Sequence, residues 1–135
     1  MKKLAQLVAQ HHATIRPADE ASIEALEKNL GFALSNEYIT YLKTFGSIDH
    51  DGDETYGLGV PEDYYLNVLN IYQELEPELN YPKQALPLLE IGDGHYYLYD
   101  NQSHKVLVWA KPNGGVVRVC DESLEDFLSK KLFGQ

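Results

Sequence analysis

Residues 86–120 read LPLLEIGDGHYYLYDNQSHKVLVWAKPNGGVVRVC, and this stretch decides the fold. Apolar runs alternate with short groups of glycine, asparagine and aspartate, which is the pattern of strands joined by tight turns. The strands expected from it are Leu86 to Ile91, His95 to Asp100, Lys105 to Lys111 and Gly115 to Cys120. The Asn113-Gly114 pair is a strong hairpin signal. The stretch therefore predicts a meander of antiparallel strands.

Helical spacing dominates the sequence before this stretch. Apolar side chains recur every three or four residues in four segments, each of which predicts a helix. The segments carry Leu4, Leu7, Val8 and His11; Ile23, Leu26 and Leu30; Tyr38, Tyr41, Leu42 and Phe45; and Val68, Ile71, Tyr72 and Leu75. Asp19 and Ser35 are suitable N-caps, and Gly31 and Gly46 suit the C-terminal ends of the second and third helices.

The remaining segments complete an α+β order. Residues 47–63 are expected to form a loop with one short strand, Tyr56 to Val60. Ser123 to Asp126 has capping-box spacing and precedes an apolar helical pattern, which predicts a C-terminal helix. The fold expected is α+β, with a mainly antiparallel sheet packed against the N-terminal helices and the C-terminal helix closing one side. A length of 135 residues suits one domain over residues 1–135.

Charge and composition exclude several classes of function. Eleven basic residues against 21 acidic ones give a net charge of −10. Such a surface repels the phosphates of nucleic acids and anionic membranes, so neither is an expected partner. No run approaches the ~20 apolar residues of a membrane span, and a single cysteine, Cys120, gives no internal disulfide. The expected location is the cytoplasm.

The motifs of catalysis and metal binding are incomplete. Counted as a calcium loop from Asp49, the glycine position falls on Glu54 and the closing ligand on Val60. Gly57-Leu58-Gly59 lacks the third glycine of a dinucleotide loop. The five histidines have no metal-ligand spacing, and no nucleophile motif is present. We therefore expect no catalytic residue, no metal and no cofactor.

The segment between Lys43 and Lys83 has the strongest functional signal. It contains nine acidic residues, five tyrosines and no lysine or arginine. Tyrosine is enriched at protein interfaces, and uncompensated acids steer a basic partner toward the surface. The same acids could instead serve solubility alone. The partner contacts predicted from this segment are Asp49, Asp51, Asp53, Glu54, Glu62, Asp63, Tyr64 and Tyr65.

The order of short motifs resembles the SUKH superfamily, whose members are similar to the yeast Smi/Knr cell-wall regulator. The matching runs are Ile23-Glu24-x-Leu26-Glu27-x-x-Leu30-Gly31, Leu34-Ser35-x-x-Tyr38-x-x-Tyr41-Leu42, Phe45-Gly46, Leu86-Pro87-Leu88-Leu89, Gly92-Asp93-Gly94-His95 and Ser123-Leu124-x-x-Phe127-Leu128. Ser35 stands where the usual form has proline, and Phe45 where it has asparagine. Serine is a good cap, so neither departure threatens the fold.

The resemblance implies a function more specific than the composition does. Bacterial SUKH members are regarded as immunity proteins that bind and neutralise toxins, many of them nucleases. A nuclease cleft is basic, so an acidic partner complements it. The expected partner is therefore a basic toxin domain. Two alternatives stay open: a regulatory scaffold that binds a housekeeping protein, and a small-ligand binder or enzyme that uses the tyrosine-rich sheet face in a deep pocket.

Overall fold

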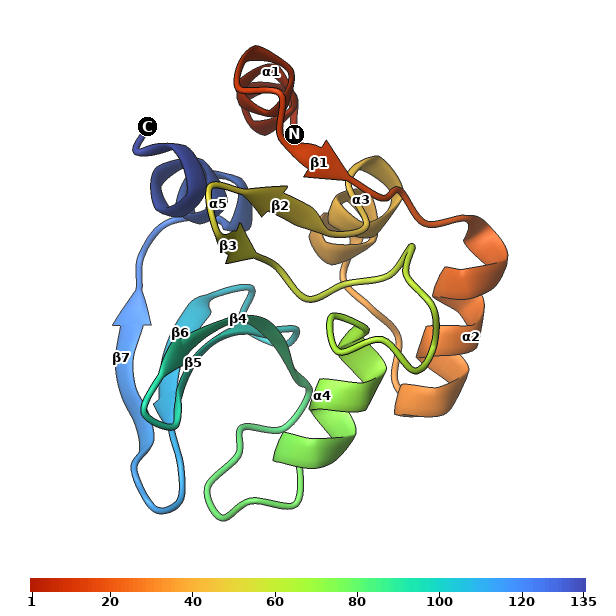
Figure 1. Cartoon of the computed structure of the whole chain (residues 1–135). Coiled ribbons are helices and arrows are strands. Elements are labelled where there is room, and N and C mark those ends of the chain that lie inside the picture. The colour runs from red at the N-terminus through yellow and green to blue at the C-terminus, as the bar shows by residue number, and fades with distance from the viewer.

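The computed structural model describes all residues, 1–135, as five helices and seven strands (Figure 1). Helices and strands follow in the order α1 (Lys2–Gln10), β1 (Thr14–Ile15), α2 (Glu20–Leu30), α3 (Asn36–Thr44), β2 (Ile48–His50), β3 (Asp53–Glu54), α4 (Val68–Leu75), β4 (Ala85–Gly92), β5 (His95–Asp100), β6 (Val106–Ala110), β7 (Gly115–Cys120) and α5 (Leu124–Phe133). No helix has the length and apolar character that crossing a bilayer requires.

The helix ends follow the capping residues. The Asp19 carboxylate accepts a hydrogen bond from the Ser22 amide at 2.8 Å, and the Ser35 hydroxyl accepts one from the Tyr38 amide at 3.1 Å. Gly31 ends α2 in the left-handed conformation, with φ of 82°, where a residue without Cβ is favoured. The predicted caps are therefore confirmed, and serine at the usual proline position does start α3.

The four predicted strands form one antiparallel sheet in the order β4-β5-β6-β7. On one face, Tyr99 stacks on Tyr38 of α3 at 5.5 Å, and Tyr97 meets Phe127 of α5 edge-on at 4.8 Å. On the other face, Trp109 packs against Tyr81, with ring centroids 5.1 Å apart. Helices α3 and α5 thus pack on one face of the sheet, and the chain between α4 and β4 packs on the other, which confirms the α+β expectation.

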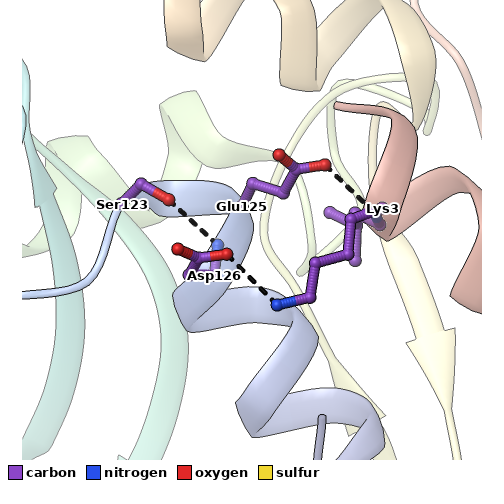
Figure 2. Close-up of polar contacts among 5 residues, drawn as sticks. Lys3, Ser123, Glu125 and Asp126 are labelled. Atoms are coloured by element: carbon purple, nitrogen blue, oxygen red, sulfur yellow. Dashed lines mark hydrogen bonds and ion pairs between the residues drawn. The ribbon is translucent and has the colours of Figure 1, made fainter.

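Helices from the two ends of the chain, α1 and α5, pack together (Figure 1). The Leu4 amide donates to the Glu125 carboxylate at 3.1 Å, and Lys3 pairs with Asp126 at 3.2 Å. Figure 2 shows these contacts beside the Ser123 cap, whose hydroxyl accepts from the Asp126 amide. The Ser123 cap is thus confirmed, whereas the Asp126 carboxylate pairs with Lys3 and does not complete a capping box. The Glu125 contact supplies an acceptor to an N-terminal amide of α1, which its own helix cannot satisfy.

The prediction of a strand from Tyr56 to Val60 is wrong. This segment has only an isolated bridge between Gly57 and Asn67. Two short strands before it, β2 and β3, form a hairpin that β1 extends to a second, three-stranded sheet. The turn is Asp51-Gly52, with φ of 53° and 87°. Both values suit a type I′ turn, for which Asp-Gly is a favoured pair, so the sequence did contain the signal.

Close backbone contacts explain why Tyr56 to Val60 is not extended. A Cβ on Gly57 would lie 1.6 Å from the Gly46 carbonyl oxygen. A Cβ on Gly46 or on Gly59 would lie 1.8 Å or 1.7 Å, respectively, from the Arg16 carbonyl oxygen. Three glycines therefore let three chain segments cross where no side chain fits. The glycines serve backbone packing here, and this crossing fixes where the β2–β3 hairpin sits.

Candidate partner-binding surface

The β2–β3 hairpin positions four of the predicted contact residues. Asp49 lies directly opposite Glu54, and Asp53 lies opposite His50. Asp51 is exposed at the turn, while Asp49, Asp53 and Glu54 are partly exposed. Like charges directly opposite each other on paired strands destabilise a sheet. The Asp49–Glu54 pair is thus unfavourable for the free protein, and a cation of a partner placed between the two carboxylates would relieve the repulsion.

Tyr65 joins the hairpin to the loop before α4. Its hydroxyl lies 2.7 Å from each carboxylate oxygen of Glu54. This hydrogen bond is the main cause that raises the pKa of Tyr65. The Tyr64 ring packs beside it, with centroids 4.7 Å apart. Tyr64 is 36% exposed and Tyr65 57%, so the predicted pair forms an exposed aromatic platform next to the hairpin.

A small hollow lies between the hairpin, this loop and β4. Its volume is about 190 Å³, and Tyr56 and Leu89 line it together with polar residues. Three carboxylates, those of Asp53, Glu54 and Glu90, lie around it with Tyr65. We call these four residues the acidic hollow. An opening with three carboxylates and apolar walls suits the end of a lysine or arginine side chain, whose stem is apolar.

Nearby carboxylates add to the raised pKa of two tyrosines, Tyr56 of the hollow and Tyr96 of β5. Burial raises the pKa of Tyr96 to about 12, with further contributions from Glu90 and Glu74. Burial likewise raises the pKa of Tyr56, and Glu90, Glu74 and Glu54 add to it. Glu90 follows Lys83 and so falls outside the acidic segment, and its β-strand position gave no signal in sequence. The tertiary fold brings it to the site.

No cation compensates these acids within the protein. The three ion pairs of the chain join Lys3 to Asp126, Lys43 to Glu20 and Lys130 to Glu122. None of them involves an acid of the segment between Lys43 and Lys83, and Glu90 has none either. The negative charge of this surface is therefore available to a basic partner.

Glu62 and Asp63 occupy a different part of the surface. Both are exposed in the loop before α4, where the Asn70 side-chain amide donates to the carbonyl oxygen of Glu62. Glu62 lines a hollow of about 510 Å³ next to α2, together with Asp19 and Asn29. The structure brings Asp53, Glu54 and Tyr65 together, but it does not bring Glu62 to that group.

The structure contains no group of three or more His, Cys, Asp or Glu side chains that could hold a metal ion. His11 and His50 approach to 5.5 Å between ring centroids, and both pack against Phe133. Tyr96 and Tyr99 of the tyrosine-rich strand are 4% and 0% exposed, so they fill the core. Tyr97 of the same strand lines a hollow of about 590 Å³ with Phe127, so a small ligand at this sheet face stays an alternative.

The family profile described as SMI1-KNR4 cell-wall matches residues 20–128, from the start of α2 into α5. The chain belongs to the SUKH superfamily. SUKH proteins are generally non-catalytic, and the family suggests a protein partner. A crystal structure of a protein from Pseudomonas syringae pv. tomato is similar to this SUKH chain, with a TM-score of 0.80, 13% identity and all of both chains covered. That likeness shows the fold. No curated protein matches the sequence.

Proposed function

We propose that this SUKH chain is a cytoplasmic immunity protein that binds and neutralises a basic toxin domain, such as a nuclease. Its predicted contacts are Asp49, Asp51, Asp53, Glu54, Glu62, Asp63, Tyr64 and Tyr65, and we add Glu90. The observation that carries the proposal is the acidic hollow: three carboxylates without internal cations, beside two exposed tyrosines. Charge, aromatic surface and family point to the same kind of partner.

Each part of this surface has a physical role in the proposed complex. The uncompensated acids accelerate the encounter with a basic toxin, because opposite charges steer diffusion. The acidic hollow accepts one lysine or arginine of the toxin, and desolvation strengthens that pair. Tyr64 and Tyr65 then provide apolar contact with little loss of side-chain entropy. Inhibition follows if the bound immunity protein covers or flanks the basic cleft that holds the toxin's substrate.

The test begins with identification of the partner. The tagged full chain is used as bait in an extract of the source cells, with washes at low and at high salt, and bound proteins are identified by mass spectrometry. We expect a basic toxin-like domain that is lost at high salt. Recovery of housekeeping proteins alone would favour the regulatory scaffold, and retention of a partner independent of salt would contradict the acidic surface.

Charge reversal then tests the surface with the purified partner. Asp53→Lys and Glu90→Lys, on two sides of the acidic hollow, are each expected to raise Kd about tenfold or more, which is about 1.4 kcal/mol. Glu24→Lys, at an exposed position on α2, changes the net charge equally and serves as the control. Equal weakening by all three variants would show that overall charge, and not this hollow, determines binding.

A further inference from the structure

Strand β7 is an open edge of the four-stranded sheet. It pairs with β6 on one side only and lies at the outside of the molecule (Figure 1). No backbone group outside the sheet bonds to residues 116–119. The opposite edge strand differs, because the Tyr56 amide donates to the Leu88 carbonyl of β4 at 2.8 Å. One edge is thus partly covered by the protein's own backbone, and the other presents unpaired N–H and C=O groups.

Exposed valines accompany this open edge. Val116, Val117 and Val119 are 46%, 52% and 50% exposed, and they are three of the seven large hydrophobic side chains that are exposed in the whole chain. Edge strands that must avoid pairing usually have lysine, proline or little apolar surface. A register shift opposite Val108 and Trp109 bends the strand here, yet the valines stay exposed. The edge therefore combines free backbone with an apolar surface, the two requirements for adding a strand.

Basic side chains lie beside the same strand. A hollow of about 590 Å³ next to β7 is lined by three basic residues, Arg118, Lys130 and Lys131, and by two acidic ones, Asp121 and Glu122. Lys130 pairs with Glu122 at 3.5 Å, whereas Arg118 and Lys131 have no ion-pair partner. Residues 105–135 contain five basic and four acidic residues. Residues 1–104 contain six basic and seventeen acidic residues. The net charge is therefore +1 for residues 105–135 and −11 for residues 1–104, so this end of the protein lacks the strong negative charge of the rest.

We propose that β7 is a docking edge for an extended, acidic segment of a partner protein, which adds to the sheet as a fifth strand. The segment's backbone pairs with the free groups of β7, and its alternate apolar side chains cover the valines. Its carboxylates meet Arg118 and Lys131, which form no ion pair within the chain, although Arg118 donates to the Cys120 sulfur and Lys131 lies over the Tyr97 ring. The site shares no residue with the acidic hollow, so the two surfaces can be tested separately.

Charge decides between this occupant and a second copy of the chain. Antiparallel pairing of two β7 strands about a two-fold axis at Arg118 would bring the Arg118 side chains of both copies together. Like charges at such an interface oppose association. An acidic segment instead neutralises the same groups, so the charges favour it over self-pairing.

The experiment is a titration of the ¹⁵N-labelled full chain with a short, end-capped peptide of alternating valine and glutamate, monitored by amide resonances. We expect saturable shifts at Val116 to Cys120, and none with the matching valine–lysine peptide. Arg118→Glu should weaken binding about tenfold or more, because it replaces a cation that meets the peptide's carboxylates by an anion. Ile91→Lys, at a position 48% exposed on the opposite edge strand, should leave it unchanged.

Three results would overturn the proposal: absence of shifts along β7, equal binding of the lysine peptide, or equal weakening by Ile91→Lys. Sedimentation of the free chain can give a fourth such result. If the chain is a dimer and Val119→Lys dissociates it, the β7 edge binds a second copy of the chain. The amide spectrum and thermal unfolding of each variant verify that it is folded. Because the affected residues are exposed, we expect these variants to fold.

Discussion

Two buried tyrosines on α3 show how single atoms determine local stability. Tyr38 and Tyr41 are both fully buried and pack against each other at 5.5 Å. The Tyr41 hydroxyl bonds to the Thr55 hydroxyl at 2.6 Å and donates to the Tyr56 carbonyl at 2.8 Å. It thereby ties α3 to the chain that follows β3. The Tyr38 hydroxyl has no hydrogen-bond partner among the protein's own groups.

Conservative replacement of these tyrosines should have opposite effects. Tyr38→Phe removes a buried, unpaired hydroxyl, and we expect the free energy of unfolding to rise by about 1 kcal/mol. Tyr41→Phe leaves the Tyr56 carbonyl and Thr55 hydroxyl with fewer partners, and we expect a loss of about 1–3 kcal/mol. Urea unfolding of the two variants measures both changes. A loss of similar size in both would mean that the Tyr38 hydroxyl has a bonding partner in solution.

At the scale of elements, the crossing of three segments holds the β2–β3 hairpin. The Arg16 amide donates to the Phe45 carbonyl at 2.8 Å, and the Leu58 amide donates to the Gly46 carbonyl at 3.0 Å. These bonds connect the chain after β1, the end of α3 and the chain after β3. The hairpin's acids are therefore presented by a rigid part of the fold, although the hairpin itself is short.

Substituting alanine for each of two glycines distinguishes the stability lost to steric crowding from the stability lost to backbone conformation. Both Gly46 and Gly52 have positive φ, of 69° and 87°. A Cβ on Gly46 would lie 1.8 Å from a carbonyl oxygen, whereas one on Gly52 meets nothing within 4 Å. We expect Gly52→Ala to cost about 1–2 kcal/mol from its backbone conformation alone. Gly46→Ala should cost much more and can prevent folding. Thermal unfolding compares them, and equal losses would contradict the crowding.

The like-charged pair of the hairpin gives a prediction that links stability to function. Asp49→Lys places a cation opposite Glu54, and we expect the free energy of unfolding to rise by about 0.2–1 kcal/mol. The same change removes an acid from the proposed surface, so we expect weaker binding of the basic partner. Chemical denaturation and a binding titration measure the two effects. A variant that is less stable and binds equally well would contradict both expectations.

At the scale of the whole molecule, tyrosine burial determines the response to alkali. Eight of the ten tyrosines have a raised pKa, with burial as the leading cause in seven and the Glu54 hydrogen bond in Tyr65. Above pH ~10 the unfolded chain loses tyrosine protons that the folded chain retains. Stability is thus fully present below that pH and falls as the pH rises through the folded-state pKa values.

We therefore expect the midpoint of urea unfolding to be constant just below pH ~10 and to fall steadily above it. Each fully buried tyrosine contributes up to about 1.4 kcal/mol per pH unit to this fall. Tyr38→Phe removes one such group, so its stability should decline less steeply with pH than that of the natural chain. Identical slopes in the two proteins would show that Tyr38 does not stay protonated in the folded state.

Most of the local structure and the character of the surface could be predicted from the order of residues alone. Caps such as Asp19 and Ser35, the apolar spacing of the helices and the Asn113-Gly114 turn act through neighbours in the chain, so they can be read in order. The excess of acids between Lys43 and Lys83 is likewise a property of composition. Tertiary structure decided what depends on distant partners. It placed Glu90 beside Asp53 and Glu54, and it separated Glu62 from them. It also made Gly57 and Gly59 part of a backbone crossing instead of a strand, because the contacts that decide these positions join segments far apart in the chain.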